Sequence, residues 1–226
     1  PVGSSGRALL LISGGIDSPV AGYMMAKRGL IVDCIHYVSP PYTSERARMK
    51  VEALCEKLTD WCGNIVFYCV PFTELQEALR DNCPEEYFTV LMRRLMVKIA
   101  NRICAANDYG AIITGESVAQ VASQTLPAIF CTNAAAEYPV FRPVIGMDKR
   151  EIVDIARQID TFDISTLPYE DCCTVFSPKH PRTHPELSEI LKAEASFDFE
   201  TLIEKAVRET EVKKFRYGRR TVELDV

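Results

Sequence analysis

The hexapeptide from Ser13 to Ser18, Ser-Gly-Gly-Ile-Asp-Ser, combines the groups that hold a polyphosphate. Gly14 and Gly15 let backbone N–H groups approach phosphate oxygens closely, and the two serine hydroxyls can donate hydrogen bonds. Asp17 can hold a metal ion that neutralises the phosphates. Two glycines alone also occur in tight turns, but the whole string indicates a phosphate loop. It is neither GxxxxGK[ST], because it lacks the lysine, nor the dinucleotide pattern GxGxxG.

The adjacent cysteines Cys172 and Cys173 are the second feature of the sequence that could carry out a reaction. They lie in an irregular, proline-rich stretch over residues 168–185, where we expect a thiol to be exposed. Four basic residues follow the pair and favour its thiolate form: Lys179, His180, Arg182 and His184. Glu170 and Asp171 precede it and would raise its pKa. The residues alone leave two interpretations open, a reactive thiol and a packed one.

The composition limits the class of protein. The chain has 226 residues, 47% of them hydrophobic, and a net charge of −5, which suits one α/β domain with a small appendage. This negative net charge argues against a chain that binds nucleic acid by itself, because phosphate contacts supply most of such affinity. Local clusters of basic residues are nevertheless compatible with contact to RNA. Nine cysteines without any CxxC spacing give no support for a zinc ribbon or a thioredoxin motif. An odd cysteine count without a secretion signal fits a cytoplasmic protein, and no apolar run is long enough to span a membrane.

Alternating apolar and amphipathic segments must position these groups. Apolar or β-branched runs predict strands at residues 7–12, 31–38, 64–70, 111–114 and 139–144, the last at a sheet edge because it contains two prolines. Helical patterns occur at residues 18–27, 43–58, 84–107, 149–158, 185–195 and 199–209. Strands that alternate with helices predict a doubly wound parallel sheet. We therefore expect an α/β fold with a C-terminal helical appendage, in which the phosphate loop joins the first strand to the first helix.

Further motifs accompany the loop along the chain. They are SPPYTSER at 39–46, MRRLM at 92–96, TGES at 114–117, QVASQTL at 120–126 and YEDCCTV at 169–175. Arg93 offers paired donors that suit a phosphate, whereas its neighbour Arg94 is expected to pair with Glu85 or Glu86. Gly115 directly follows a predicted strand and indicates a second close approach of the backbone to a bound nucleotide.

With the loop, these motifs resemble the tRNA 4-thiouridine synthetase family of PP-loop ATP-pyrophosphatases over nearly the whole chain. The resemblance implies that ATP adenylates O4 of the uridine at position 8 of tRNA, and that sulfur then displaces AMP to give 4-thiouridine. A role in sulfur supply for thiamine thiazole synthesis is also compatible with it. The implied division is a linker remnant at 1–6, a PP-loop ATP-pyrophosphatase domain at 7–165, and a cysteine-bearing loop with a helical extension of the same domain at 166–226.

The resemblance also assigns site residues. It places pyrophosphate and Mg²⁺ on the loop, at Ser13, Gly14, Gly15, Asp17 and Ser18, with Asp17 as metal ligand and catalytic residue. The ends of the first two strands would frame the adenine of ATP, at Leu11, Ile12, His36 and Tyr37. ATP would also contact Arg93, Gly115 and Gln124. Cys173 would carry sulfur as a persulfide, and Cys172 is a candidate resolving thiol. His36 is equally compatible with a plain core or lining position.

The implied partners are tRNA, a cysteine desulfurase as sulfur donor, and a THUMP-containing N-terminal region of the parent chain. The linker-like residues 1–6 lead us to expect that region before this chain. Because no rhodanese-type domain follows within the chain, sulfur would come directly from a desulfurase, as sulfide, or from an iron–sulfur cluster. Cys131, Cys172 and Cys173 are potential cluster ligands, but the missing CxxC spacing disfavours a cluster. A homodimer is compatible with the sequence.

Two other functions remain open. A PP-loop enzyme that uses ammonia or an amine as nucleophile would keep the ATP chemistry but would not need Cys173. A non-catalytic ATP-binding module could instead serve as a sulfur relay. Replacement of Cys173 by alanine separates an amine-using enzyme, which keeps its turnover, from a sulfurtransferase, which loses 4-thiouridine formation.

Overall fold

A computed structural model describes residues 2–169 and 171–222, and its centre is a six-stranded sheet with the order β5-β4-β1-β2-β3-β6. Five strands run parallel and β6 is antiparallel to its neighbour β3. The strands are β1 (Arg7–Leu11), β2 (Ile31–Val38), β3 (Ile65–Pro71), β4 (Ala111–Ile113), β5 (Val140–Phe141) and β6 (Glu211–Phe215). The predicted parallel strands are therefore confirmed, with the proline-containing one at the sheet edge.

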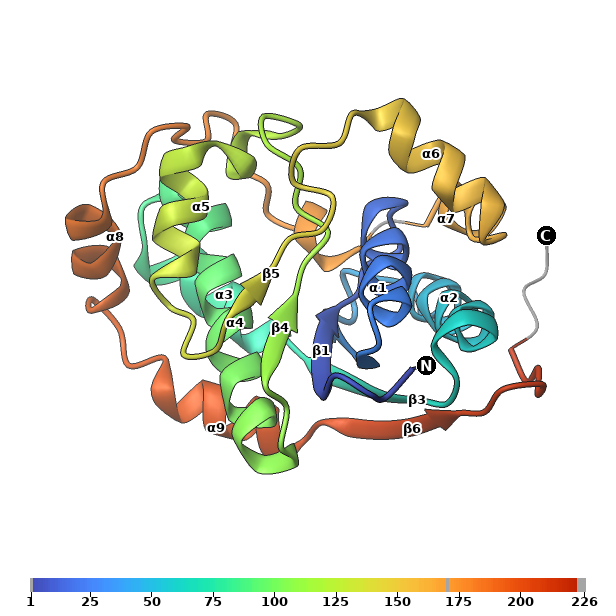
Figure 1. Ribbon diagram of the computed structural model, residues 1–226. Coiled ribbons are helices and arrows are strands. Elements are labelled where there is room, and N and C mark those ends of the chain that lie inside the picture. The colour runs from blue at the N-terminus through green and yellow to red at the C-terminus, as the bar shows by residue number, and fades with distance from the viewer. Residues whose placement is uncertain (1, 170, 223–226) are drawn as a thin grey trace.

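Helices cover both faces of the sheet (Figure 1). The first layer contains α1 (Asp17–Lys27), α2 (Glu45–Cys62), α6 (Lys149–Gln158) and α7 (Phe162–Ser165). The second contains α3 (Thr73–Asn82), α4 (Phe88–Asn107), α5 (Leu126–Asn133), α8 (Leu187–Glu194) and α9 (Glu200–Arg208). Short 3₁₀ turns lie at Glu85–Tyr87, Ala122–Gln124 and Cys172–Thr174. This is the doubly wound α/β fold that the sequence predicts.

The strands bury both of their faces. Leu9 and Ile35 pack into the core under α4, whereas Leu10 and Cys34 pack into the core under α1 and α2. Successive side chains of a strand point to opposite faces, so a strand covered on both sides needs an unbroken apolar run. That requirement explains why the apolar runs in the first half of the chain predicted the strands well.

Parallel pairing brings the ends of the central strands to one edge of the sheet. Leu11 lies opposite Ile35 on β2, and Leu10 lies opposite Ile113 on β4. The loop after β1, the end of β2 and the segment after β4 therefore meet, and α1 begins directly after the loop.

The C-terminal region differs from a purely helical extension. Helices α8 and α9 pack on α4, and the chain then continues into β6, which the sequence did not predict. Only Phe215 of this edge strand is buried, and lysines occupy two of its other positions, so the segment lacks the apolar run of a central strand. Helix α3 was also missed. No helix among the described residues is long and apolar enough to cross a membrane.

Candidate functional site

A cavity of about 470 Å³ opens at the carboxyl ends of the parallel strands. Its volume lies within the range of small-molecule sites. The lining includes most of the residues predicted from the sequence: Leu11, Ile12, Ser13, Asp17, Ser18, His36, Tyr37, Arg93, Gly115, Gln124, Cys172 and Cys173. The predicted residues Gly14 and Gly15 belong to the loop but do not line the cavity. The structure thus brings segments far apart in the sequence to one place.

The phosphate loop is held by its own serines. The Ser13 N–H donates to Ser18 Oγ at 3.0 Å, and the Gly15 N–H donates to Ser13 Oγ at 3.4 Å. Helix α1 begins after Ile16, which provides no side-chain cap, so N–H groups at the helix start remain available to an anion.

Gly115 marks a close approach, but to the protein itself. A Cβ atom at this position would lie 2.7 Å from the Ser18 nitrogen and 2.8 Å from Ser18 Cα. Only a residue without a side chain lets the segment after β4 pack on the first turn of α1. The close approach in this structure is therefore to the start of α1, and the predicted approach to a bound nucleotide stays a prediction.

Asp17 is the carboxylate of the loop that lines the cavity. Its Oδ1 accepts a hydrogen bond from Lys149 Nζ at 2.9 Å, a residue that the sequence analysis did not single out. Mg²⁺ commonly binds one or two carboxylates together with substrate phosphates, and Asp17 fits that role. Within the part of the chain that the structure describes, no three His, Cys, Asp or Glu residues group as a metal site.

A second carboxylate, that of Asp171, contacts the loop directly. Its Oδ2 accepts a hydrogen bond from the Gly14 N–H at 2.8 Å, and Oδ1 is buried without a hydrogen-bond partner. Lys50 lies beside it and donates through Nζ to the carbonyls of Leu167 (2.8 Å) and Tyr169 (3.4 Å). In the sequence, Asp171 is notable only as a neighbour of the cysteines, so its contact with the loop was not predicted.

His36 and Tyr37, predicted to frame adenine, are fixed lining residues. His36 Nδ1 lies 3.1 Å from the Ile12 carbonyl, which makes Nδ1 the protonated nitrogen, and burial lowers the pKa of this imidazole. The Tyr37 hydroxyl donates to the Met96 carbonyl at 2.6 Å, and burial raises its pKa well above the usual range. Both side chains are therefore neutral and suit contact with a ring better than proton transfer.

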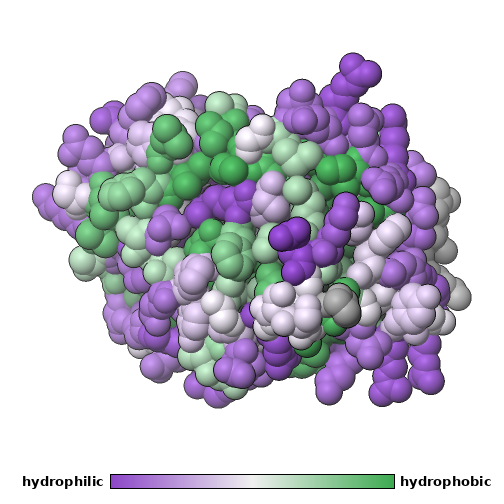
Figure 2. Space-filling model, viewed as in Figure 1, coloured by the Kyte–Doolittle hydropathy of each residue, from purple (hydrophilic) through white to green (hydrophobic). Residues whose placement is uncertain are grey.

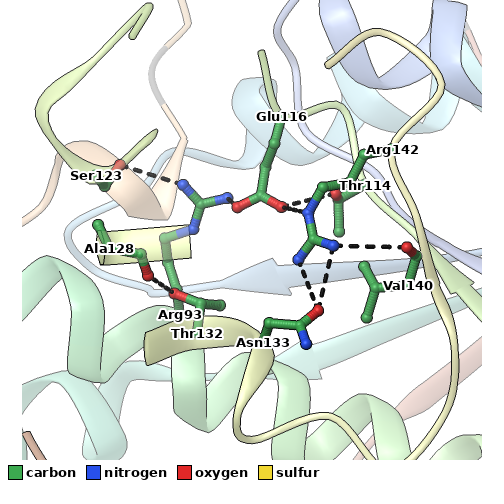
Figure 3. Close-up of polar contacts among 9 residues, drawn as sticks. All are labelled: Arg93, Thr114, Glu116, Ser123, Ala128, Thr132, Asn133, Val140 and Arg142. Carbon is green, nitrogen blue, oxygen red and sulfur yellow. Dashed lines mark hydrogen bonds and ion pairs between the residues drawn. The ribbon is translucent and has the colours of Figure 1, made fainter. Parts of the chain in front are cut away.

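Glu116 joins two arginines at the cavity wall (Figure 3). Its Oε1 accepts from Arg93 Nη2 at 2.5 Å, and its Oε2 accepts from Arg142 Nε at 2.7 Å and Thr114 Oγ1 at 2.9 Å. Burial alone would raise the pKa of Glu116, but the two guanidinium groups outweigh it and the pKa is lowered. Arg93 also donates to Ser123 Oγ at 3.1 Å. The ionised carboxylate therefore fixes the direction of Arg93.

Arg142 is oriented from several sides. Its Nη1 and Nη2 each donate to Asn133 Oδ1 at 3.2 Å, and Nη1 also donates to the Val140 carbonyl at 3.5 Å (Figure 3). Arg142 and Asn133 were not predicted, because 26 residues separate Arg142 from Glu116 and no local spacing reports such a pair. Gln124, which was predicted, lines the cavity, and unlike Arg142 and Asn133 it has a buried side-chain oxygen, Oε1, without a hydrogen-bond partner.

The two cysteines differ sharply. Cys173 is exposed, as expected for this irregular stretch, whereas Cys172 is buried, contrary to that expectation. A hydrogen bond from the Cys172 thiol, and then the charge of Arg93, lower the pKa of Cys173, while the pKa of Cys172 is raised well above its usual range. The cation that acts on Cys173 is thus Arg93. Asp171 opposes this effect as expected, and Glu170 lies outside the described residues.

A cluster of three cysteine ligands is not assembled. Cys131 is buried and its thiol donates to the Pro185 carbonyl at 3.7 Å. Together with Cys172 and Cys173 it forms no metal-binding group among the described residues. The donor set present therefore does not fit an iron–sulfur cluster.

Exposed apolar side chains gather over α5 and the loop before it (Figure 2). They include Val118, Val121, Leu126 and Phe130. Val121 also lines the cavity, so this apolar surface continues to the opening that holds Cys173.

Comparisons with known proteins found a matching family model and similar curated sequences. The family model described as "Thiamine biosynthesis protein (ThiI)" matches residues 3–199. A probable tRNA sulfurtransferase of Acetivibrio thermocellus is 54% identical over 212 residues, covering 94% of this chain and 54% of the relative. One from Brevibacillus brevis is 52% identical over 214 residues, covering 95% and 54%. The chain spans about half the length of these curated relatives.

A solved structure resembles the whole fold. It is described as a 4-thiouridine synthetase–RNA complex with bound ATP, and it superposes with a TM-score of 0.92 at 39% identity. The match covers 96% of this chain and 57% of that chain.

Proposed function

Since the chain belongs to the ThiI family, we propose that it is the catalytic part of an ATP-dependent tRNA sulfurtransferase. The enzyme adenylates O4 of the uridine at position 8 of tRNA and replaces that oxygen with sulfur, giving 4-thiouridine. The observation that carries the proposal is one cavity that unites a phosphate loop, Arg93 and the exposed thiol of Cys173. ATP and RNA are bound to the similar solved synthetase, which supports both as ligands here.

The loop binds the phosphates of ATP that leave as pyrophosphate. Backbone N–H groups at the start of α1 and the hydroxyls of Ser13 and Ser18 supply donors, and negative charge is favoured at a helix N-terminus. Mg²⁺ held by Asp17 would neutralise charge on the departing pyrophosphate. Lys149, hydrogen-bonded to Asp17, holds that carboxylate in place.

The strand ends hold the base of ATP. Leu11 and Ile12 provide apolar surface and backbone groups, and the neutral rings of His36 and Tyr37 also line the cavity. Neutral aromatic and apolar walls suit stacking against adenine without cost for a buried charge.

Arg93 stabilises the charge that develops at the α-phosphate. When O4 attacks this phosphorus, negative charge grows on its oxygens, and a fixed guanidinium stabilises it without reorganisation. Glu116, with Arg142 behind it, keeps Arg93 directed into the cavity. Gln124 has an unpartnered oxygen that accepts a hydrogen bond from the bound ATP.

Cys173 delivers the sulfur. Its lowered thiol pKa increases the thiolate fraction, and the thiolate accepts sulfur from the persulfide of a cysteine desulfurase. The outer sulfur, or sulfide released from it, attacks C4 of the adenylated uridine, and AMP leaves with the former O4. Cys172 acts as the resolving thiol, because the two residues are adjacent. It attacks Sγ of Cys173 and breaks the bond between that Sγ and the outer sulfur, which leaves as sulfide or stays on C4 as 4-thiouridine. The Cys172–Cys173 disulfide that forms is reopened by an external dithiol reductant.

The remaining features of the parent protein follow from the same proposal. A THUMP-containing N-terminal region binds the tRNA, which is consistent with the net charge of −5 of this chain, and the enzyme works in the cytoplasm. Residues 7–165 form the PP-loop domain and 166–226 its cysteine-bearing extension. The family description supports an additional role in thiamine synthesis. A homodimer is compatible with this arrangement.

The test is direct. The parent protein is incubated with ATP, Mg²⁺, a cysteine desulfurase with cysteine, and unmodified tRNA, and the absorbance of 4-thiouridine is followed. We expect the modified base to form in the wild type and not in Cys173→Ala. An enzyme that uses ammonia or an amine would keep its turnover in Cys173→Ala, and a non-catalytic relay would release no pyrophosphate. Either result would refute the proposal.

A further inference from the structure

The contact between Asp171 and the phosphate loop is unusual for a site that receives anions. The Gly14 N–H is a loop donor of the kind that phosphate oxygens use, and here it donates to Asp171 Oδ2 at 2.8 Å. A Cβ on Gly14 would lie 3.3 Å from both carboxylate oxygens, so the carboxylate rests on the backbone of the loop. Asp171 lines the cavity whereas Gly14 does not, so a negatively charged group of the protein lies between this loop donor and the cavity.

Asp171 is held there by the segment around it. Lys50 Nζ donates to the carbonyls of Leu167 and Tyr169, and Gln76 Nε2 donates to the Cys172 carbonyl at 2.8 Å. The carboxylate itself has one partnered oxygen, while its Oδ1 is buried without a hydrogen bond. A buried acceptor without a partner costs desolvation free energy, which destabilises this position of the carboxylate. A bound anion can therefore replace the carboxylate at the Gly14 N–H.

The cysteines follow this carboxylate without a linker. The turn Cys172–Thr174 starts at Asp171, whose carbonyl accepts from the Thr174 N–H at 3.2 Å. A displacement of the backbone at Asp171 therefore moves Cys172 and Cys173 as well.

We propose that Asp171 is a positioning residue that couples occupancy of the phosphate loop to the placement of Cys173. Without nucleotide its carboxylate fills the anion position at Gly14. When the pyrophosphate group of ATP binds, the two like charges cannot share that position, the carboxylate leaves, and the cysteine turn moves with it. The thiol then takes its working place only after ATP is bound. This inference rests on the proposed function.

Titration calorimetry with inorganic pyrophosphate and Mg²⁺ tests the competition. Asp171→Asn keeps the shape of the side chain and removes its charge, so pyrophosphate should bind about tenfold more tightly than to the wild type. Asp163→Asn, which removes the charge of an exposed aspartate of α7, is the matched control and should bind as the wild type does. Equal or weaker binding by Asp171→Asn overturns the inference, and weaker binding would make Asp171 a contributor to phosphate or metal binding.

Alkylation of Cys173 by iodoacetamide, followed by mass spectrometry of the peptide that carries it, tests the coupling in the wild type and in Asp171→Asn. Addition of pyrophosphate and Mg²⁺ should change the wild-type rate by about threefold or more, because the cysteine turn moves. The rate in Asp171→Asn should already be shifted and should respond less. An unchanged alkylation rate of wild-type Cys173 at saturating pyrophosphate refutes this inference but leaves the proposed function of the loop intact. A wild-type chain that binds no pyrophosphate refutes the proposed function of the loop.

Discussion

Replacement of Glu116 by alanine should destabilise the protein strongly. The side chain is 3% exposed, and it is the common partner of Arg93 and Arg142, which are 21% and 15% exposed. Loss of one partner of a buried ion pair costs about 3–5 kcal/mol, because the remaining charge stays buried and uncompensated. The partial exposure of both arginines places this case near the lower limit, about 3 kcal/mol.

Urea and thermal unfolding followed by circular dichroism measure this loss. For a chain of this size, about 3 kcal/mol corresponds to a decrease of about 6–12 °C in Tm. Glu200→Ala is the matched control, since it removes the partner of Arg102 from a pair whose side chains are 46–48% exposed, and it should cost at most about 1 kcal/mol.

The pH dependence adds a second check on Glu116. Its pKa is lowered in the folded protein, so the carboxylate stabilises the fold above the pKa of the unfolded chain, about 4.3. That contribution disappears as the pH falls through the lower folded pKa. The difference between wild type and Glu116→Ala should therefore be full at pH 7 and shrink in acid. A difference below about 1 kcal/mol at pH 7, or one that grows in acid, would refute the reasoning.

Three further predictions concern the cavity. Gly115→Ala should destabilise the protein by about 1–3 kcal/mol and weaken pyrophosphate binding, because its Cβ would lie 2.7 Å from the Ser18 nitrogen; unfolding and calorimetry measure both. Asp17→Asn should weaken ATP binding about tenfold in the presence of Mg²⁺ but not in its absence, and an unchanged Mg²⁺ dependence would contradict the assignment. The alkylation rate of Cys173, plotted against pH, should reach its plateau at a lower pH than that of an ordinary thiol. Arg93→Met should move the midpoint of this curve to higher pH. A wild-type midpoint at or above the ordinary cysteine range would refute the role of Arg93.

The sequence predicted most of the parts that follow local rules. Residues 31–38 and 149–158 form the expected strand and helix, and Ser44 caps α2 by accepting from the Ala47 N–H. Buried parallel strands require unbroken apolar runs, and a helix that starts at a capping side chain, as α2 does at Ser44, leaves a signal within a few residues. The meeting of loop and strand ends in one cavity followed from the rule for parallel sheets.

The parts that were missed depend on contacts between distant segments. Arg94 was expected to pair with Glu85 or Glu86, but its Nε donates to Glu194 at 2.6 Å, 100 residues away. The basic residues after the cysteines were expected to stabilise the thiolate, and the structure places Arg93 in that role. Pairings of this kind are fixed by tertiary packing, which local spacing does not encode.

The transfer of the uridine oxygen tests the central claim most directly. A tRNA carrying ¹⁸O at O4 of uridine 8 is converted by the parent protein with ATP and a desulfurase, and the products are analysed by mass spectrometry. Adenylation of the carbonyl oxygen predicts that the label appears in the phosphate of AMP, in an amount equal to the 4-thiouridine formed. Label released into water or found in pyrophosphate, with AMP unlabelled, would contradict the account.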